Sequence, residues 1–226
     1  MIPEKYVRRI TDHMLVDLYL SGVDGGRVIW PWKMQAVHEA DQTHVITSER
    51  YVLDSGWQRP DLGTRDVLDR AYTLGADVAV LVDVYQDKDE TVDRILKDIE
   101  IVDSHPYDGE LMVPLQAPYG DCYRELEGTG SIYAIGGLKD GLDAERLEAA
   151  REVRAVAGPD VRLHGLGWGP SEQIAKAIHR DPDLLESIDY STPLRKGIDM
   201  LPSESGAERS TITAAGAVVR LLRDAR

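Results

Sequence analysis

The sequence predicts an α/β protein folded as one small (β/α)8 barrel, and three observations favour this fold class. Strand-sized apolar segments alternate with amphipathic helical segments, a pattern that indicates parallel βαβ units. The strand segments are almost continuously apolar, which indicates that both faces of the sheet are covered. No linker, low-complexity tract or change in composition divides the 226 residues, so we expect a single domain over residues 1–226.

Seven segments have the length and apolar character of strands. They are Leu15–Gly22, Tyr51–Gly56, Asp77–Val84, Glu110–Gln116, Ser131–Gly137, Val161–Gly169 and Ser187–Pro193. An eighth strand, which would complete a barrel of the TIM type, is expected near Val28 or between Ser210 and Ala215. An open, doubly wound sheet is the alternative. Its G-x-G-x-x-G signature is absent, and the nearest match, GLGWGP from Gly165, lacks the third glycine.

The expected helices are recognised by their 3.6-residue period and by the residues at their ends. They cover Arg65–Ala76, Asp89–His105, Asp121–Leu126, Asp143–Gly158, Ser171–Ile178 and Ala214–Arg223. In the fourth of these, Asp143 is expected as the N-cap and Gly158 as the stop. Residues 28–40 combine a short apolar piece with an expected helix.

The composition indicates a globular protein with no membrane partner. Hydrophobic residues make up 42% of the chain, and no apolar run is long enough to span a bilayer. The N-terminus lacks the apolar stretch of a secretion signal. The single cysteine, Cys122, excludes an internal disulfide and a cysteine-rich zinc cluster. We therefore expect a cytoplasmic protein.

The charge of the chain has two interpretations. A net charge of −14 ordinarily argues against a nucleic-acid partner. However, 19 Arg against 7 Lys, together with abundant Asp, also fits a protein adapted to high salt, whose acidic surface keeps it in solution. In the second interpretation the acidic total says little about partners, and a local group of arginines would make any phosphate contacts.

Polar residues stand where the predicted strands end, and in a barrel these ends share one mouth. They are Asp54, Asp83, Gln116, Gly136 with Gly137, His164 with Gly165, and Asp189. Each alone has an ordinary structural explanation, such as a turn or a loop cap. Three carboxylates around one pocket suit glycosidic chemistry, in which one attacks the anomeric carbon, one moves a proton and one reads hydrogen-bond donors. A ring with a carbonyl and an N–H/NH2 edge, such as guanine, would satisfy the set.

Six elements in the same order make the chain resemble the tRNA-guanine transglycosylase family, TIM-barrel enzymes that exchange guanine for a 7-deazaguanine. The two most specific are YAIGGLKDG, which resembles the family's aIGGLavGE, and SIDYSTPLR, which keeps the spacing of mFDcvmPTR. The others are DSGWQ, LVDVY, LQAPYGDCYREL and HGLGWGPSEQIAKAI. Together they span residues from about 50 to 196.

The resemblance implies a role for each matching residue. Asp189 would be the nucleophile that bonds to C1′ of the nucleotide as guanine leaves, and Asp54 would be the general acid/base. Asp83 would accept from the N1 and 2-amino edge, while Gln116 and the Gly137 N–H would contact the O6 side. The separation is physically reasonable, because a nucleophile must stay ionised whereas a proton shuttle needs a pKa near working pH.

The resemblance also implies further substrate-binding positions. Gly136 and Leu138 belong to the IGGL element. Trp57 would take the aromatic stacking position, and Tyr85 would border the pocket. His164, which precedes Gly165, replaces the methionine that covers the base in the family.

The chain departs from the family in the parts that grip tRNA. The family's zinc site uses three Cys and one His after the nucleophile strand, but no cysteine follows Cys122, so we expect no metal or other cofactor. This compact, zinc-free pattern resembles the DpdA-like transglycosylases, which are often found in viruses and genomic islands and insert 7-deazaguanines into DNA. The resemblance therefore favours DNA over tRNA and a virus- or mobile-element-encoded protein that acts in a host cell.

The expected polynucleotide must present an extruded or single-stranded base, since C1′ is reached around the glycosidic bond. The candidates for phosphate contacts are Arg195 and Lys196, with Arg59 and Arg65 as further ones. tRNA is the nearest alternative substrate. Other interpretations stay open: a homo-oligomer, a non-catalytic subunit that pairs with a larger transglycosylase, and an unrelated barrel hydrolase of small nucleosides.

Overall fold

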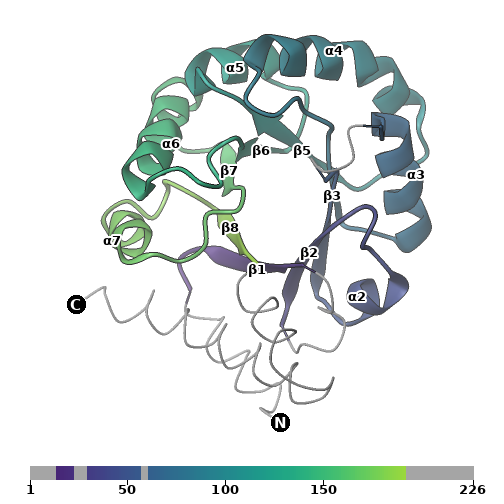
Figure 1. Ribbon diagram of the computed structural model, residues 1–226, viewed down its shortest axis with the longest axis horizontal. Coiled ribbons are helices and arrows are strands. Elements are labelled where there is room, and N and C mark those ends of the chain that lie inside the picture. Colours follow the sequence, from purple (N-terminus) through teal and green to yellow (C-terminus); the bar gives the residue numbers. More distant parts are fainter. Residues whose placement is uncertain (1–13, 23–29, 57–60, 192–226) are drawn as a thin grey trace.

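The computed structural model describes residues 14–22, 30–56 and 61–191, and these residues form a closed barrel of eight parallel strands (Figure 1). The strands follow one another around the ring in chain order, and β1 pairs with β8 to close it. They are β1 (Asp17–Ser21), β2 (Trp32–Ala36), β3 (Arg50–Asp54), β4 (Val78–Val80), β5 (Glu110–Leu115), β6 (Ile132–Ile135), β7 (Arg162–Gly165) and β8 (Ser187–Tyr190). The predicted (β/α)8 architecture is confirmed.

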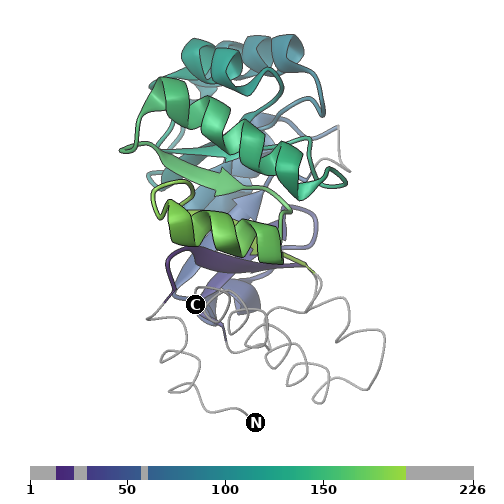
Figure 2. The same ribbon diagram turned by 90° about the vertical axis from the view of Figure 1, so that its left-hand side faces the viewer.

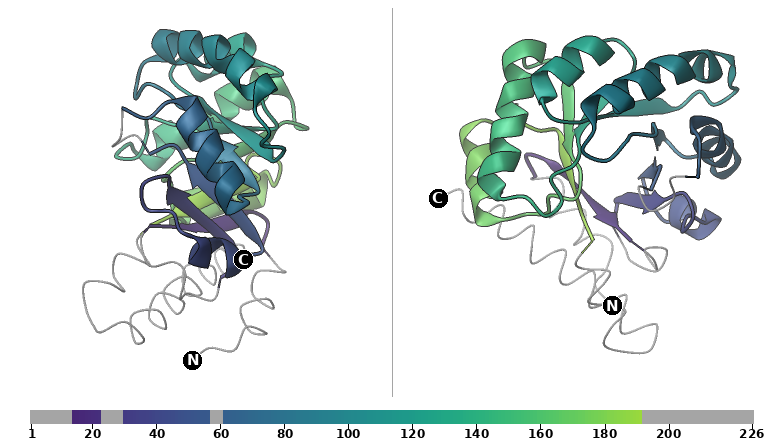
Figure 3. Two further views of the ribbon diagram at one scale, coloured as in Figure 1. Left: turned by 90° about the vertical axis from the view of Figure 1, so that its right-hand side faces the viewer. Right: turned by 45° about the horizontal axis from the view of Figure 1, so that its top comes forward.

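Helices form the outer layer of the barrel. In the described part of the chain they are α2 (Gln42–Ile46), α3 (Thr64–Leu74), α4 (Lys88–Ser104), α5 (Tyr119–Leu126), α6 (Asp143–Ala157) and α7 (Glu172–Arg180). Figure 2 shows α6 and α7 side by side on one flank, and Figure 3 shows α3 to α6 continuing around the ring. Within the described ranges, each helix is too short or too polar to cross a membrane.

The second strand differs from the prediction for residues 28–40, where a helix was expected. Residues Trp32–Ala36 form β2, so the eighth strand lies close to the first of its two expected places. Its inward side chain Met34 is apolar, but Lys33 and Gln35 point to the outer side and are buried there. Lys33 donates a 2.6 Å hydrogen bond to Thr47, the residue that ends α2. Because of these outward polar residues, the sequence of β2 lacks the continuous apolar run that marks the other strands.

Two helix starts also differ from the sequence prediction. The N-cap of α6 is Leu142 rather than Asp143, which is the first helical residue. The Glu145 carboxylate accepts from the Leu142 N–H at 2.7 Å and satisfies a free donor of the first turn. The short α2 was not predicted, and Asp41 caps it by accepting from two backbone N–H groups. The alternative strand at 210–215 and the helix expected at 214–223 lie outside the described residues.

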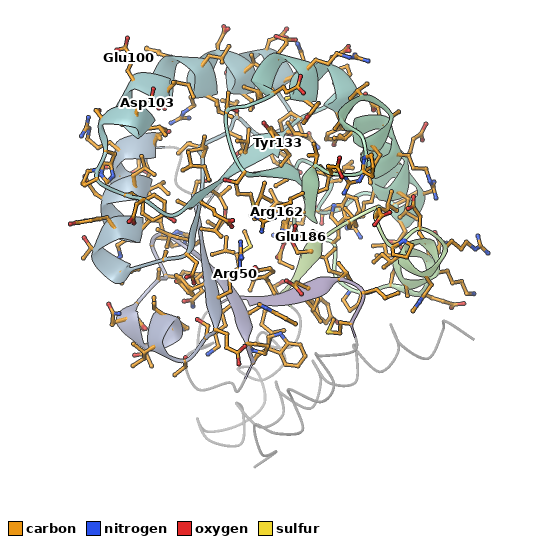
Figure 4. The ribbon with its side chains drawn as sticks, turned by 180° about the vertical axis from the view of Figure 1, so that it is seen from behind. Arg50, Glu100, Asp103, Tyr133, Arg162 and Glu186 are labelled. Carbon is orange, nitrogen blue, oxygen red and sulfur yellow. The ribbon has the colours of Figure 1, made fainter. Side chains whose placement is uncertain are left out.

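Side chains of each strand alternate between the barrel interior and the layer of outer helices. In β6, Ile132 and Ala134 point into the barrel, whereas Tyr133 and Ile135 pack against the outer helices. The Tyr133 hydroxyl donates to the Leu126 carbonyl at 3.1 Å and accepts from the Gly128 N–H at 2.8 Å. Figure 4 shows this side chain between the ring and the helices. Both faces of the sheet are covered, as the apolar strand sequences predict.

An ionic network closes the amino end of the barrel. Arg50, Glu110 and Arg162 are the first residues of β3, β5 and β7, so alternate strands place them in one layer. Arg162 contacts both carboxylate oxygens of Glu186 at 2.6 and 2.7 Å and one oxygen of Glu110 at 2.6 Å, and Arg50 contacts the other oxygen of Glu110. Figure 4 shows Arg50, Arg162 and Glu186 within the ring of strands. Structural ion pairs therefore occupy this end.

Candidate active site

A cavity of about 280 Å³ lies at the opposite end of the barrel, where the carboxyl ends of the strands meet. Every strand, or the loop that follows it, contributes a lining residue. In chain order these include Ser21, Met34, Asp54, Val80, Pro114, Gly136, Leu166 and Asp189. This is the end of a (β/α)8 barrel that carries the active site in enzymes with this fold.

Asp189 is the most firmly held carboxylate in the cavity wall. It lies on β8 with 7% of its surface exposed. Ser21 donates to Oδ2 at 2.7 Å, the Gly167 N–H donates to Oδ1, and His164 Nε2 lies 3.4 Å from Oδ1. Burial works to raise the pKa of Asp189, but these three partners outweigh it and lower the pKa below its usual value. Asp189 is therefore ionised at neutral pH.

Asp54, the last residue of β3, has the opposite electrostatic character. Burial raises its pKa, the backbone N–H groups of Gly56 and Ser55 partly oppose this, and the charges of Asp189 and Asp83 add to it. The resulting pKa is about 7. Asp54 can therefore both give and take a proton near neutral pH, which is the requirement for a general acid/base.

Asp83 follows β4 and is oriented by Gln116. The Gln116 side-chain amide donates to Asp83 Oδ2 at 2.5 Å, and its oxygen accepts from the Gln86 N–H at 3.1 Å. Burial raises the pKa of Asp83, and the hydrogen bond from Gln116 lowers it in part. Asp83 lines the cavity, whereas Gln116 lies behind it with 1% of its surface exposed. Gln116 was predicted to contact the base, and its nearest polar partners here are protein groups.

Gly136 and Gly137 leave space for the side-chain amide of Gln116. A Cβ atom at Gly136 would lie 2.8 Å from Gln116 Nε2, and one at Gly137 would lie 2.6 Å from Gln116 Oε1. Gly137 also has a φ of +73°, a conformation that side chains disfavour. The sequence predicted that the paired glycines admit a flat group close to the backbone. The flat group that the structure places there is the Gln116 amide, while the same glycines line the cavity.

Besides Gln116, three of the predicted substrate-binding residues, His164, Gly165 and Leu138, are not part of the cavity lining. His164 lies below Asp189 inside the barrel, with no exposed surface. A Cβ at Gly165 would lie 2.5 Å from the Trp168 ring, so this glycine serves packing. The Leu138 carbonyl accepts from Arg146 Nε and from the Gly141 N–H, both at 3.0 Å.

The remaining predicted residues lie at the rim or outside the described ranges. Tyr85 lines the cavity and is 45% exposed, so it lies at the mouth. Trp57, Arg195 and Lys196 belong to residues 57–60 and 192–226, which the structure does not describe. The predicted stacking and phosphate contacts of these three residues remain predictions.

Sequence reasoning missed several lining residues, of which Ser21, Gly167 and Lys139 matter most. Ser21 ends β1, so the strand-end argument that found Asp54 would have found it had it been applied to the first strand. Gly167 and Lys139 lie in loops after β7 and β6, and their positions depend on loop conformation rather than on a periodic pattern.

The site therefore combines an ionised carboxylate, a carboxylate that titrates near neutral pH and a third that is fixed by an amide. Two carboxyl groups whose environments push their pKa values apart can divide nucleophilic and acid/base roles between them. Glycosidic bond cleavage uses such a division.

No protein-family model and no curated protein matches the chain.

Proposed function

We propose that the chain is a base-exchanging transglycosylase, which replaces guanine in a polynucleotide, DNA in preference to tRNA, by a 7-deazaguanine. The observation that carries this proposal is the pair Asp54 and Asp189. Both line one cavity, and their pKa values are shifted in opposite directions, to about 7 and below the usual carboxyl value respectively. The six sequence elements that resemble the tRNA-guanine transglycosylase family support the same assignment.

In the proposed first step, an Asp189 oxygen forms a bond to C1′ while the bond between C1′ and guanine N9 breaks. The electron pair of that bond goes to guanine, which takes a proton from protonated Asp54. In the second step, the Asp54 carboxylate takes the N9 proton of the incoming 7-deazaguanine. Its N9 then attacks C1′ and displaces Asp189. The enzyme returns to its starting protonation state, which a carboxyl group of pKa about 7 can do in both directions.

The cavity offers suitable groups for a guanine-like base. Asp83 would accept from the N1–H and 2-amino group, and Gln116 would hold it in place through the 2.5 Å hydrogen bond. The Gly137 N–H would donate to the O6 carbonyl. The cavity volume, about 280 Å³, is just below the roughly 300–1,000 Å³ of typical small-molecule sites, so it suits one base with its sugar. A polynucleotide substrate would therefore have to insert a single extruded nucleotide.

The test is incorporation of radiolabelled guanine into single-stranded DNA, duplex DNA and tRNA by the purified full-length chain. We expect incorporation into DNA and a covalent protein–nucleic acid adduct that survives denaturing electrophoresis. Asp189→Ala should abolish both, and Asp54→Asn should lower the exchange rate by at least about a hundredfold. Exchange by the Asp189→Ala variant would overturn the mechanism.

The same assay, extended to free guanosine as a substrate, separates the alternatives. Incorporation into tRNA alone would replace DNA by tRNA as the substrate. Release of free guanine from guanosine, without incorporation into any polymer, would indicate a nucleoside hydrolase. Absence of exchange and adduct with every substrate would indicate a non-catalytic subunit and would overturn the proposed activity of the isolated chain.

A further inference from the structure

His164 is a buried polar residue in the mainly apolar interior of the barrel. Its neighbours in the barrel interior include Tyr19, whose ring centroid lies 5.9 Å from that of His164 at an interplanar angle of 75°. The imidazole has no exposed surface. A buried imidazole loses its water partners, and this loss is unfavourable unless protein groups replace them. The partners of its two ring nitrogens therefore bear on its role.

The two ring nitrogens face two residues of β8. Nδ1 lies 2.8 Å from Ser187 Oγ, in the pair of residues that the parallel register of β7 and β8 places side by side. Nε2 has no hydrogen-bond partner among the described residues, and it lies 3.4 Å from Asp189 Oδ1. If Ser187 donates to Nδ1, the proton of the ring is on Nε2 and points at the Asp189 carboxylate.

A hydrolytic triad contains the same residue types as Ser187, His164 and Asp189. In such a triad the serine is accessible and the aspartate is buried, whereas here the positions are reversed. Ser187 is 3% exposed and does not line the cavity, so its hydroxyl is not accessible to a substrate. Asp189 does line the cavity. The residue that a substrate can reach is therefore Asp189, whereas Ser187 is buried and only contacts His164.

We propose that His164 is a positioning residue for Asp189: anchored by Ser187 through Nδ1, it directs an Nε2 donor at Oδ1 and holds the carboxylate in the orientation for attack. This role rests on the proposed transglycosylase function, in which Asp189 is the nucleophile. It assigns a purpose to a histidine that lies beneath the cavity rather than in its wall, and that stands where the family has a methionine.

Removal of the His164 Nε2 donor would also make the charged form of Asp189 less stable. The other titratable groups of the cavity lining are Glu39, Asp54, Asp83, Tyr85 and Lys139, and Tyr19 on β1 pairs with Asp189 in the barrel. Three of these six are carboxyl groups, which disfavour a further negative charge. Without His164, the Ser21 hydroxyl and the Gly167 N–H remain as the neutral donors to Asp189.

Two amide substitutions test the two nitrogens of His164 separately. In His164→Gln, the amide nitrogen can reach the position of Nε2 and donate to Asp189. In His164→Asn, the shorter amide can reach only the position of Nδ1, so the contact with Ser187 remains and the donor to Asp189 is lost. Thermal melting of both variants checks that each folds, and their similar polarity makes them a matched pair.

We expect single-turnover exchange of guanine to fall about ten- to a hundredfold in the Asn variant, the range for loss of one hydrogen bond to a charged group, and to stay within about threefold of wild type in the Gln variant. In the Asn variant the acidic limb of the pH–rate profile and the titration of the Asp189 carboxyl signal in carbon-13 NMR should both move to higher pH, because a donor to the ionised carboxylate is lost. Equal losses in both variants, with the Asp189 titration unchanged, would show that His164 serves packing alone and would overturn the proposal.

The wild-type protein separates the two proposals. Absence of exchange and of adduct in wild type would overturn the proposed function. Normal exchange by wild type together with normal exchange by the Asn variant would leave that function intact and overturn the role of His164. The NMR titration does not depend on catalysis, so it measures the His164–Asp189 interaction in either case.

Discussion

The Gln116 side-chain amide donates a 2.5 Å hydrogen bond to Asp83 Oδ2, and the backbone of Gly136 and Gly137 covers the same amide. These residues come from strands and loops that are separated in sequence, and they meet at the wall of the cavity. The glycines therefore act on the site indirectly, because they leave the volume in which Gln116 orients Asp83. This arrangement predicts what a single added methyl group would do.

Gly137→Ala is expected to weaken guanine binding by displacing the Gln116 amide. The new Cβ would lie 2.6 Å from Gln116 Oε1, and the residue would keep a φ of +73°. Gly75→Ala is the matched control, because Gly75 has a φ of +71° with no atom near the added Cβ. Both variants should lose about 1 kcal/mol of unfolding free energy through backbone strain. Only Gly137→Ala should lose guanine affinity, by about tenfold in calorimetry. Equal affinities in the two variants would contradict this explanation of the glycine pair.

Asp54→Asn is expected to stabilise the fold at alkaline pH while it slows exchange. The pKa of Asp54 is about 7 in the folded protein and about 3.9 in an unfolded chain. The folded state therefore keeps a proton that the unfolded state releases, so the free energy of unfolding falls as the pH rises from about 4 to about 7. The Asn variant lacks this decrease. At pH 8 it should be more stable than wild type by up to about 4 kcal/mol, and at pH 4 the two should be similar.

Urea denaturation at the two pH values measures this difference, and the exchange assay measures the loss of activity. A gain in stability that accompanies loss of activity is typical of residues placed for function rather than for folding. An Asn variant that is no more stable than wild type at pH 8 would show that the Asp54 carboxyl group is not destabilised by its site.

The sequence predicted the barrel and the principal carboxylates because both depend on one-dimensional patterns. Alternating apolar strands and amphipathic helices determine the architecture, and the strand ends determine which residues reach the cavity. Asp54, Asp83 and Asp189 were found in this way, and all three line the cavity. What such patterns do not show is the direction in which each carboxyl pKa moves, since this depends on neighbours from other strands.

The features that were missed depend on polar contacts between distant residues. In β2, the outward Lys33 and Gln35 are buried against Thr47 and His44, so an apolar pattern does not mark the strand. Likewise, Gln116 follows a strand as predicted, but its contact with Asp83 crosses from the end of β5 to the loop after β4. Such contacts depend on the three-dimensional packing of the barrel, so they cannot be predicted from the spacing of residues within one segment of the sequence.

Asp17→Asn, at the opposite end of the barrel, is expected to stabilise the protein without affecting exchange. Burial and the charge of Glu186 raise the pKa of Asp17 to about 6, although Arg50 and Arg162 lower it in part. Because the folded pKa is raised, the stability present at low pH is lost as the pH rises from about 4 through about 6. At pH 7.5 the Asn variant should gain about 1 kcal/mol, a value reduced for partial exposure to solvent.

The measurement is urea denaturation at pH 4.5 and 7.5 together with the exchange rate at pH 7.5. The variant serves as a control for Asp54→Asn, since it removes a carboxyl group with a raised pKa from outside the cavity. Loss of exchange in Asp17→Asn would mean that the ionic network at the amino end influences the site.

Arg146→Lys is expected to loosen the loop between β6 and α6 and to weaken base binding. The Arg146 guanidinium donates to the carbonyls of Leu138 at 3.0 Å, Lys139 at 2.5 Å and Trp168 at 3.2 Å, so it joins this loop to the one after β7. A lysine keeps the charge but cannot reach three carbonyls in this geometry. Loss of the hydrogen bond to the buried Trp168 carbonyl, together with the contacts to the two loop carbonyls, should lower the free energy of unfolding by about 2 kcal/mol.

Hydrogen exchange tests the local part of this prediction. The amides of residues 138–143 should exchange at least about tenfold faster in Arg146→Lys, because the loop opens more often, whereas those of β2 on the far side should change little. Since Gly137 and Lys139 line the cavity, guanine affinity should fall with the protection of this loop. Arg151→Lys, a substitution on the same helix at an exposed arginine, is the matched control and should leave both quantities unchanged. If the two lysine variants exchange at the same rate, the Arg146 contacts do not hold the loop.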